Sequence, residues 1–459
     1  MAPDHHAPDN SDPQSRFERR VARYLSPLQK FIDMQPATGI LLIAATFLAL
    51  LFANTGLHDR AEHFAEIHAG FVLNDWAFLL SLREWVSDGL LALFFFLIGL
   101  EIKRELLAGS LRHRKHVTMI VVAACGGMAM PALIYTALNY GTPGQAGWAI
   151  PMATDTAFAV GILALLVRFL SPAVAVFLAA LAIIDDLGAI LVITLFYTDS
   201  LQLDSLVRAG TVFACLVLAN RAGIRRGGVY MLLGALLWWH VYQSGIHATL
   251  AGILMAIAIP SRPKVSKADF IQRARTLLFT FEVRGEKERK MLETPEQHML
   301  AVDLERMIKA DSTPLQRWET FLGHPVMIVI LPLFALLNAG VVLNAESFGA
   351  ALISPVTQGI MLGLVIGKPA GITLGAMLVY KMGWGVLPRG VRFREVLAAG
   401  LLAGIGFTMS VFIATLGFGQ NPALIAEAKI GILLSSLLAA VLGSLWAYFS
   451  YKPRPVRGF

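Results

Sequence analysis

Residues 173–197 read AVAVFLAALAIIDDLGAILVITLFY, and this stretch decides the fold class. A helix rises about 1.5 Å per residue, so a run of this length crosses the roughly 30 Å hydrocarbon core of a bilayer. Asp185 and Asp186 lie at its centre, where one carboxylate costs roughly 2.5–3.5 kcal/mol on insertion scales. Because a leucine pair would fill the same space without this cost, the two acids indicate a cation or proton site within a membrane. A structural pair neutralised by a buried partner is the alternative.

The composition is that of a membrane protein. Of the 459 residues, 56% are hydrophobic and 15% are charged, whereas soluble domains average about 25% charged residues. The net charge of +7 does not indicate nucleic-acid binding, because the basic residues lie in short segments between apolar runs. Cys125 and Cys215 lie in apolar runs, so we expect small packing residues and not a disulfide framework or a metal cluster.

The apolar runs predict an all-α polytopic membrane protein with about twelve transmembrane helices. Several of the runs are short or interrupted by Gly and Pro. The predicted spans cover residues 36–55, 85–104, 116–138, 148–168, 173–197, 203–220, 228–243, 246–260, 324–344, 355–381, 394–416 and 424–449.

The distribution of Lys and Arg predicts the orientation of these spans. Basic residues are frequent in the polar N-terminal tail, in alternate links and in the C-terminal tail, whereas the other links carry almost none. The positive-inside rule therefore places both termini in the cytoplasm, as an even number of spans requires, and no cleavable signal peptide is expected. The predicted organisation is a cytoplasmic tail (1–35), spans one to eight (36–260), a charged cytoplasmic insertion (261–322), spans nine to twelve (323–451) and a cytoplasmic tail (452–459).

Two links differ from the rest. Residues 62–87 form a long external link, in which Asn74-Asp75 between apolar runs predicts either a β-hairpin near 68–82 or a surface loop. Such a hairpin could pair with its twin in a dimer. The insertion carries charges of both signs and shows helical spacing at 297–310, which predicts a partly helical regulatory or linking segment. A solvated spacer without a special role is the alternative.

Charged side chains inside the spans define the candidate site. Lys368 needs a carboxylate partner, and Asp155, Asp185 and Asp186 are available. Adjacent helical residues do not face the same way, so one member of the Asp pair can contact Lys368 while the other faces a cavity. Three acids against one lysine leave an excess of negative charge that attracts a cation and protons in turn. This competition within a coupled cluster predicts exchange.

Two stretches predict interrupted helices at membrane depth. Pro151 removes a backbone donor just before Thr154, Asp155 and Thr156 in span four, and residues 404–410 (GIGFTMS) are rich in glycine in span eleven. Interrupted helices expose carbonyl groups and half-helix ends that bind ions or are neutralised by nearby charge. Paired interruptions in corresponding halves predict an inverted-repeat transporter.

Two further titratable residues lie within predicted spans. Asp88, near the start of span two, either lines an access funnel or is a hydrogen-bonded structural residue near the interface. His247 titrates near neutral pH or, more simply, is a satisfied packing histidine.

In these residues and their order along the chain, the sequence resembles the NhaA family of Na+/H+ antiporters. This family is itself a known example of the inverted-repeat architecture. The resemblance covers approximately 36–260 and 323–451. The matching stretches are 94–106 (FFFLIGLEIKREL), 147–158 around Thr154-Asp155, 180–197 around the Asp pair, 244–252, 331–340, 366–371 and 404–414.

The resemblance implies a fold and a mechanism. It implies an NhaA-like inverted repeat, with spans four and eleven discontinuous, and an electrogenic exchanger that expels Na+ or Li+ from the cell. Asp186 and Asp185 would bind the ion and protons with Thr154 close by, and Lys368 would pair with Asp185 in one protonation state. Asp155 and Lys368 would offset the crossed half-helix ends. Such proteins are homodimers in the bacterial inner membrane, joined through the external hairpin.

The family also carries a cytoplasmic pH-sensing cluster. Glu101, Arg104 and Glu105 match it in this sequence. Near the end of the insertion, Glu319 and His324 are further candidates, but their spacing is shifted from the family pattern, and the insertion is longer than the loop that the family carries there.

Three other classes of protein fit less well. An intramembrane aspartyl protease needs two aspartates that share a proton, but on different helices. A sodium-coupled solute symporter would need several cationic groups to bind an organic anion, and Lys368 is the only basic residue that the sequence places deep within a predicted span. A non-transporting scaffold would not bury these charges. We therefore predict a pH-regulated secondary transporter, not an enzyme, whose partners are Na+, Li+, H+ and membrane lipid, without a cofactor or nucleic acid.

Overall fold

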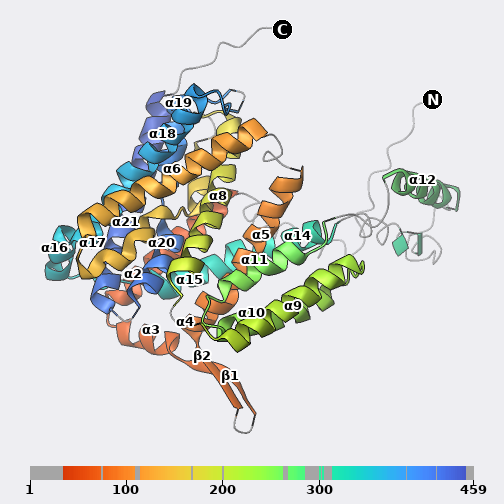
Figure 1. The fold of residues 1–459 in the computed structure, drawn as a ribbon, viewed down its shortest axis with the longest axis horizontal. Coiled ribbons are helices and arrows are strands. Elements are labelled where there is room, and N and C mark those ends of the chain that lie inside the picture. Colours follow the sequence, from red (N-terminus) through yellow and green to blue (C-terminus); the bar gives the residue numbers. More distant parts are fainter. Residues whose placement is uncertain are drawn as a thin grey trace, which may run out of the picture.

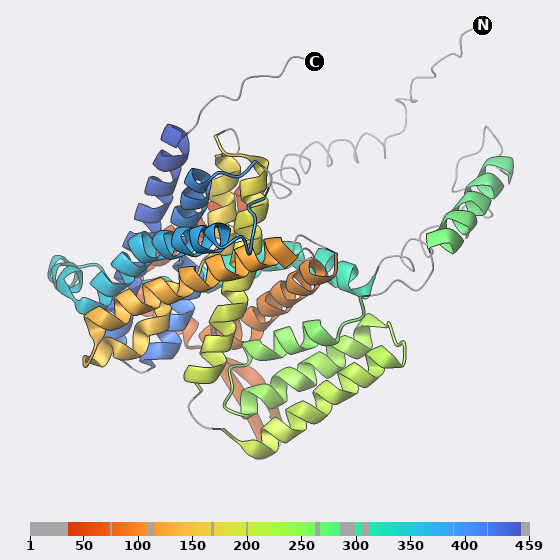
Figure 2. The same cartoon turned by 45° about the horizontal axis from the view of Figure 1, so that its top comes forward.

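The structure is a computed structural model, and helices make up most of it. It describes residues 35–73, 76–108, 114–166, 169–198, 201–261, 267–284, 299–300, 302–303, 313–388, 390–419 and 421–450. Figure 1 shows a body of packed helices from which a hairpin projects at one end, and the same arrangement is seen obliquely in Figure 2.

The elements follow one another along the chain with short connections. The first half contains α2 (Gln35–Ala53), α3 (His58–Ala65), β1 (His68–Leu73), β2 (Trp76–Ser81), α4 (Leu82–Glu84), the π-helical η1 (Trp85–Leu90), α5 (Leu91–Ala108), α6 (Arg114–Asn139), the 3-10 helix η3 (Pro143–Met152), α7 (Thr156–Leu165), α8 (Pro172–Phe196), α9 (Leu203–Arg221), α10 (Gly227–Gln243) and α11 (Thr249–Ala258). The second half contains α12 (Lys267–Arg284), α14 (Pro314–Pro325), the π-helical η5 (Val326–Ile330), α15 (Leu331–Asn338), α16 (Ala345–Ile353), α17 (Pro355–Leu362), the π-helical η6 (Gly363–Gly367), α18 (Lys368–Lys381), α19 (Phe393–Ala403), α20 (Phe407–Phe418) and α21 (Pro422–Ser450).

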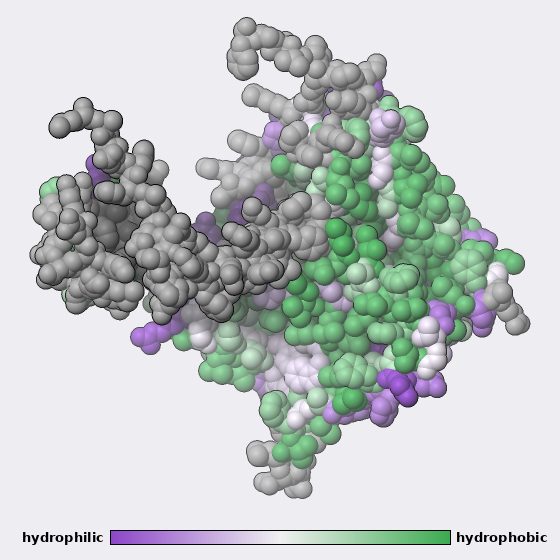
Figure 3. Space-filling model, turned by 180° about the vertical axis from the view of Figure 1, so that it is seen from behind, coloured by the Kyte–Doolittle hydropathy of each residue, from purple (hydrophilic) through white to green (hydrophobic). Residues whose placement is uncertain are grey.

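The helices have the length and composition of membrane spans. Among the described residues, seven helices are long and apolar enough to cross a bilayer, and up to ten spans result if each bent pair counts as one. A broad hydrophobic surface covers the face seen in Figure 3, with hydrophilic residues along its lower edge. The prediction of an all-α polytopic membrane protein is therefore confirmed, while the count of twelve spans stays a prediction.

Two pairs of consecutive helices meet at a bend close to Pro151 and within the glycine-rich stretch 404–410. The pair η3 and α7 bends by 43°, and the pair α19 and α20 bends by 50°. The two breaks touch, because the backbone N–H of Asp155 donates to the carbonyl of Ile405 (2.7 Å). Helix α8 and the α17–η6–α18 helix pack beside these breaks.

Close helix packing around the breaks depends on glycine. A Cβ atom on Gly126 of α6 would lie 2.4 Å from the carbonyl oxygen of Gly371 on α18, and a Cβ on Gly371 would lie 2.0 Å from that of Gly126. The backbones of α6 and α18 therefore touch, as small residues permit in membrane proteins.

The link after α2 contains an antiparallel hairpin. Strand β1 pairs with β2 in the register Phe71–Phe78 and Leu73–Trp76, and Asn74-Asp75, the predicted turn, lies outside the described residues. The base of the hairpin is fixed by Trp85, whose ring nitrogen donates to the carbonyl of Ala69 (2.8 Å). The hairpin is the one sheet among the described residues.

The predicted charged insertion and the following span are joined in one helix. The helix starts at Pro314, within the region 261–322, and runs through η5 to the end of α15. Thr313 caps this start by accepting from the N–H of Gln316 (3.2 Å), and proline is favourable at the first helical position. Helix α12 lies apart from the helical body in Figures 1 and 2, and most of residues 297–310 lie outside the described residues.

The cysteines are on the surface. Cys125 and Cys215 are free thiols, and both are exposed, so the prediction that they are small packing residues is wrong. The physical reason is that a lipid-facing side of a helix is as apolar as its packed side, so hydrophobicity alone does not separate the two.

Candidate functional site

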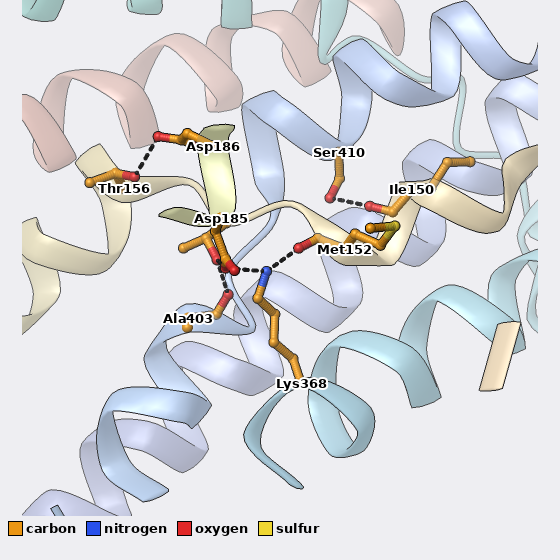
Figure 4. A network of polar contacts seen from close by, with 9 residues as sticks. Ile150, Met152, Thr156, Asp185, Asp186, Lys368, Ala403 and Ser410 are labelled. Carbon is orange, nitrogen blue, oxygen red and sulfur yellow. Dashed lines mark hydrogen bonds and ion pairs between the residues drawn. The ribbon is translucent and has the colours of Figure 1, made fainter. Parts of the chain in front are cut away.

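Helix α8 carries the two acids to the centre of the molecule. Asp185 has 0% and Asp186 has 3% of its surface exposed. The helix places them on different faces, and Figure 4 shows Asp186 turned toward Thr156 while Asp185 points toward Lys368.

Asp185 is neutralised by a direct ion pair. The Nζ atom of Lys368 lies 2.9 Å from Oδ2 of Asp185, and both side chains are fully buried. The hydroxyl of Thr154 donates to the same oxygen (2.8 Å). Lys368 also donates to the carbonyl of Met152, as Figure 4 shows. The π-helical turn η6 ends directly before Lys368, and such turns are frequent at functional sites.

Asp186 has fewer partners than its neighbour. Its Oδ2 accepts a hydrogen bond from the hydroxyl of Thr156 (3.3 Å). Its Oδ1 and the Oδ1 of Asp185 are buried without a hydrogen-bond partner among the described residues. Because buried polar atoms in native structures are nearly always satisfied, two such oxygens on adjacent acids are an exception to the usual pattern.

Asp155 holds the two half-helices together. Its Oδ1 accepts from the backbone N–H of Phe158 (3.0 Å), which caps α7. Its Oδ2 accepts from both the backbone N–H (3.0 Å) and the hydroxyl (2.6 Å) of Thr408, in the first turn of α20. One carboxylate thus lies at the positive N-terminal ends of two helices, where a negative charge is stabilising.

The carbonyl ends of the preceding segments are satisfied by different groups. Lys368 reaches Met152 at the end of η3, whereas the carbonyl of Ala403 at the end of α19 lies 3.0 Å from the hydroxyl of Thr154, whose one proton it shares with Asp185. The hydroxyl of Ser410 donates to the carbonyl of Ile150 (2.8 Å), which ties α20 to η3. The contact with Lys368 therefore lies at one of the two carbonyl ends, and Thr154 supplies the donor at the other.

A cavity connects Asp186 with a charged cluster at the far end of α5. Its volume is about 340 Å³, and Asp186, Thr156, Glu101, Arg104 and Glu105 are among its lining residues, together with apolar side chains from α5, α7 and α8. Asp185 is not among them. The cavity gives Asp186 a path away from the hairpin end of the molecule, toward the end that the sequence predicts to be cytoplasmic.

The predicted pH-sensing residues divide into two groups. Arg104 lies 2.9 Å from Glu319, so one ion pair joins α5 to α14 at the mouth of the cavity, and Arg104 lies 3.5 Å from Glu105 on α5 itself. Glu101 is half-buried beside them. His324 forms the second group: it is exposed and follows Glu319 by more than one turn of α14.

Asp88 and His247 lie outside this cavity. Asp88 is half-buried in η1, at the other end of α5 from Glu101, and its backbone carbonyl accepts from the ring nitrogen of Trp238 (2.8 Å). The Nε2 atom of His247 lies 2.8 Å from the carbonyl of Tyr197, a contact that a packing histidine would make.

Two residues of this network carried no role in the sequence-based prediction. Thr408 contacts Asp155, and Ser410 contacts Ile150. The available signal was the run of hydroxyl residues on either side of each break, because an interrupted helix at membrane depth needs donors for its free carbonyl groups.

Comparison with known proteins shows the family of the chain. The model of the family Na+/H+ antiporter 1 matches residues 29–447. The chain belongs to this family. The Na+/H+ antiporter 1 family consists of secondary transporters and not of enzymes.

Curated relatives in this family are similar over nearly their whole length. The chain is 43% identical over 436 residues to the Na+/H+ antiporter NhaA of Sulfurimonas denitrificans, covering 95% of this chain and 98% of that protein. It is 41% identical over 442 residues to NhaA 1 of Saccharophagus degradans, covering 96% and 95%. It is 44% identical over 427 residues to NhaA of Oleidesulfovibrio alaskensis, covering 92% and 94%.

Proposed function

We propose that this protein is a Na+/H+ antiporter in which Asp185 and Asp186 bind Na+ and protons in turn. The observation that carries the proposal is the pair of adjacent buried acids with one unpartnered oxygen each, one acid paired with Lys368 and the other facing a cavity. Family membership and the printed names of the relatives point the same way.

Asp186 is the proposed primary cation ligand. Its free Oδ1 and the neighbouring hydroxyl of Thr156 offer hard oxygen atoms, which alkali cations prefer, at the inner end of the cavity. A carboxylate that is protonated loses its attraction for Na+, and a carboxylate that binds Na+ releases its proton. Competition at one buried site therefore couples the two ions without a covalent step.

Asp185 would supply the second exchangeable charge. In the structure, Lys368 neutralises Asp185 at 2.9 Å. A second positive charge beside Asp186 weakens that pair, because Lys368 and the cation repel each other in a low dielectric. We propose that Asp185 then turns from Lys368 to Na+, with Thr154 as a further oxygen ligand, and that proton binding restores the starting arrangement.

The broken helices would let this site change access. Around the crossing, Asp155, Thr408, Thr154 and Ser410 make side-chain contacts that satisfy half-helix ends without a continuous helix. Such short contacts can break and reform, whereas the intact helices beside them move as rigid bodies. We propose that the bent pairs, η3 with α7 and α19 with α20, are the two discontinuous helices of an inverted repeat.

The test is a proton-gradient assay in vesicles that contain the purified protein. Added Na+ should dequench a pH-sensitive dye at pH 8.5, and Asp186→Asn should abolish this response while the protein still inserts. Asp204→Asn, on exposed helix α9, is the matched control and should keep the wild-type response. A wild-type protein without dequenching would refute antiport, and an active Asp186→Asn variant would move the site elsewhere.

Two finer properties belong to the same proposal. Two acids and one monovalent cation suggest that more protons enter than Na+ ions leave, so transport would be electrogenic. A membrane-potential dye should then respond to added Na+.

Li+ is smaller than Na+ and equally hard, so we propose that it also serves as a substrate. Added Li+ should therefore dequench the pH-sensitive dye in the vesicle assay.

We also propose that pH regulates the exchanger through the cluster at the cavity mouth. Protonation of Glu319 would weaken its ion pair with Arg104 (2.9 Å) and so loosen α14 from α5 beside the cavity. Glu319→Gln should shift the pH profile of Na+ exchange, and an unchanged profile would remove Glu319 from this role.

The molecule is proposed to be a homodimer in the bacterial inner membrane with both termini in the cytoplasm. The hairpin exposes 70% of Phe71 and 64% of Val72, and an unpaired β-edge with apolar side chains invites pairing with a second copy. Replacing Phe71 and Val72 by Ser should yield monomers in detergent, as measured by light scattering.

A further inference from the structure

A second pocket lies at the hairpin end of the molecule, away from the ion site. It is enclosed by the end of α2, by α3, and by parts of α15 and α21, and we call it the α3 pocket. Its volume is about 330 Å³, within the roughly 300–1,000 Å³ range of ligand sites. Phe52, Leu57, Leu333 and Leu337 supply much of its apolar wall.

The charged residues of the α3 pocket are mainly basic. Arg60, Arg83 and Lys429 line it, and Glu62 is the one acid among its lining residues. Arg83 and Glu62 form an ion pair of 2.7 Å. Two basic groups are left without a matching acid in the pocket, so an anion would be favoured there.

Two of these basic groups have hydrogen-bond donors to spare. The Nε atom of Arg83 is buried and has no hydrogen-bond partner among the described residues, although its Nη2 contacts Glu62. The ammonium of Lys429 donates to the carbonyl of Gly340 (3.1 Å), and an ammonium carries three donors. A buried, unsatisfied donor indicates a missing acceptor, and phosphate oxygens suit both Arg and Lys.

The location of the α3 pocket suits a lipid. Helix α3 leaves α2 at 116° and carries Asp59, Arg60 and Glu62 on its polar positions. It therefore turns aside at the end of an apolar span, where lipid headgroups meet water. Phe64 on this helix and Leu57 directly before it are 56% and 42% exposed and give this segment an apolar side.

We infer that the α3 pocket binds an anionic glycerophospholipid. The phosphate accepts hydrogen bonds from Nε of Arg83 and from the ammonium of Lys429, and an acyl chain lies along the apolar wall. A free phosphate ion offers the same oxygen atoms but has nothing to fill the apolar part of the pocket. Bound lipid would link α3, α15 and α21 and so stabilise the fold. This inference does not depend on the ion that the protein transports.

The test measures stability in detergent as dioleoyl phosphatidylglycerol is added. The melting temperature should rise, and dioleoyl phosphatidylcholine, with identical chains and no net charge, should give a smaller rise. Lys429→Gln and Arg83→Gln should each need about fivefold more phosphatidylglycerol for half of the effect. Lys381→Gln changes an exposed lysine outside the pocket and should leave the titration unchanged.

Two further measurements complete the test. The first separates a lipid phosphate from free phosphate, and the second uses a variant that is expected to strengthen lipid binding, which a misfolded protein would not do. Inorganic phosphate at the same concentration should not reproduce the rise. Glu62→Gln removes the acid that competes for Arg83 and should lower the amount of lipid required. Equal effects of the two lipids, an equal effect of inorganic phosphate, or an unchanged titration in both Lys429→Gln and Glu62→Gln would each overturn the proposal.

Discussion

At the scale of single residues, the central fact is that Lys368 and Asp185 are buried together. Neither side chain has any exposed surface, and their charged atoms are 2.9 Å apart. An ion pair of this kind contributes little compared with an apolar pair, but removal of one member leaves a buried charge without compensation. The pair therefore serves better as a switchable partner than as a source of stability.

Lys368→Ala should destabilise the protein by about 3–5 kcal/mol, because it leaves the Asp185 carboxylate buried and unpaired. Unfolding in detergent measures this. The double variant Lys368→Ala/Asp185→Asn should recover part of the loss, since both charges are then gone. Lys381→Ala, on the exposed end of α18, should stay within about 0.5 kcal/mol of wild type. An unchanged stability in Lys368→Ala would contradict the ion pair.

At the scale of elements, the two bent helix pairs, η3 with α7 and α19 with α20, pack against longer helices such as α8 and α18. Asp155 lies at the N-terminal ends of both α7 and α20, and the carbonyl ends of η3 and α19 are satisfied by Lys368 and Thr154. In a bilayer no water is available for these backbone groups, so each needs a partner from the protein. The close contact between α6 and α18 places Lys368 where it can reach its partners.

Gly126→Ala tests the contact between α6 and α18. The new Cβ would lie 2.4 Å from the carbonyl oxygen of Gly371, a backbone atom that cannot turn aside, so the helices must separate. We expect a loss of about 1–3 kcal/mol in unfolding experiments, with reduced Na+ exchange. Gly210→Ala is the matched control, because a Cβ there meets no atom within 4 Å. Equal stabilities for the two variants would show that the close contact is not required.

At the scale of the whole molecule, the charged insertion leaves and re-enters the fold at one place. The N–H of Leu315 donates to the carbonyl of Pro260 (3.2 Å), so the two ends of the insertion meet. Thr313 caps the helix that follows, and α12 lies apart from the helical body in Figure 2. The membrane-embedded fold therefore closes without the residues between these ends.

Replacement of residues 262–311 by a short Gly-Ser linker should yield a folded protein that still exchanges Na+ for protons, because loop closure across neighbouring ends costs little. Melting temperature and vesicle dequenching check this. A deletion that extends to residue 316 should be less stable, since it removes Thr313 and the start of α14. Loss of folding in the shorter deletion would show that the insertion is part of the structural core.

The sequence by itself determined that the chain is built of apolar helices and which charged residues lie within the apolar runs. These properties are local, because a bilayer demands helices of fixed length and penalises every buried charge. The residue pattern left open which acid contacts Lys368, and the family resemblance implied Asp185, which is the partner in the structure. Only the tertiary structure decided that Asp155 reaches Thr408 and that Thr156 lies beside Asp186. Asp155 and Thr408 are 253 positions apart, and no local pattern can report a contact that the packing of distant helices creates.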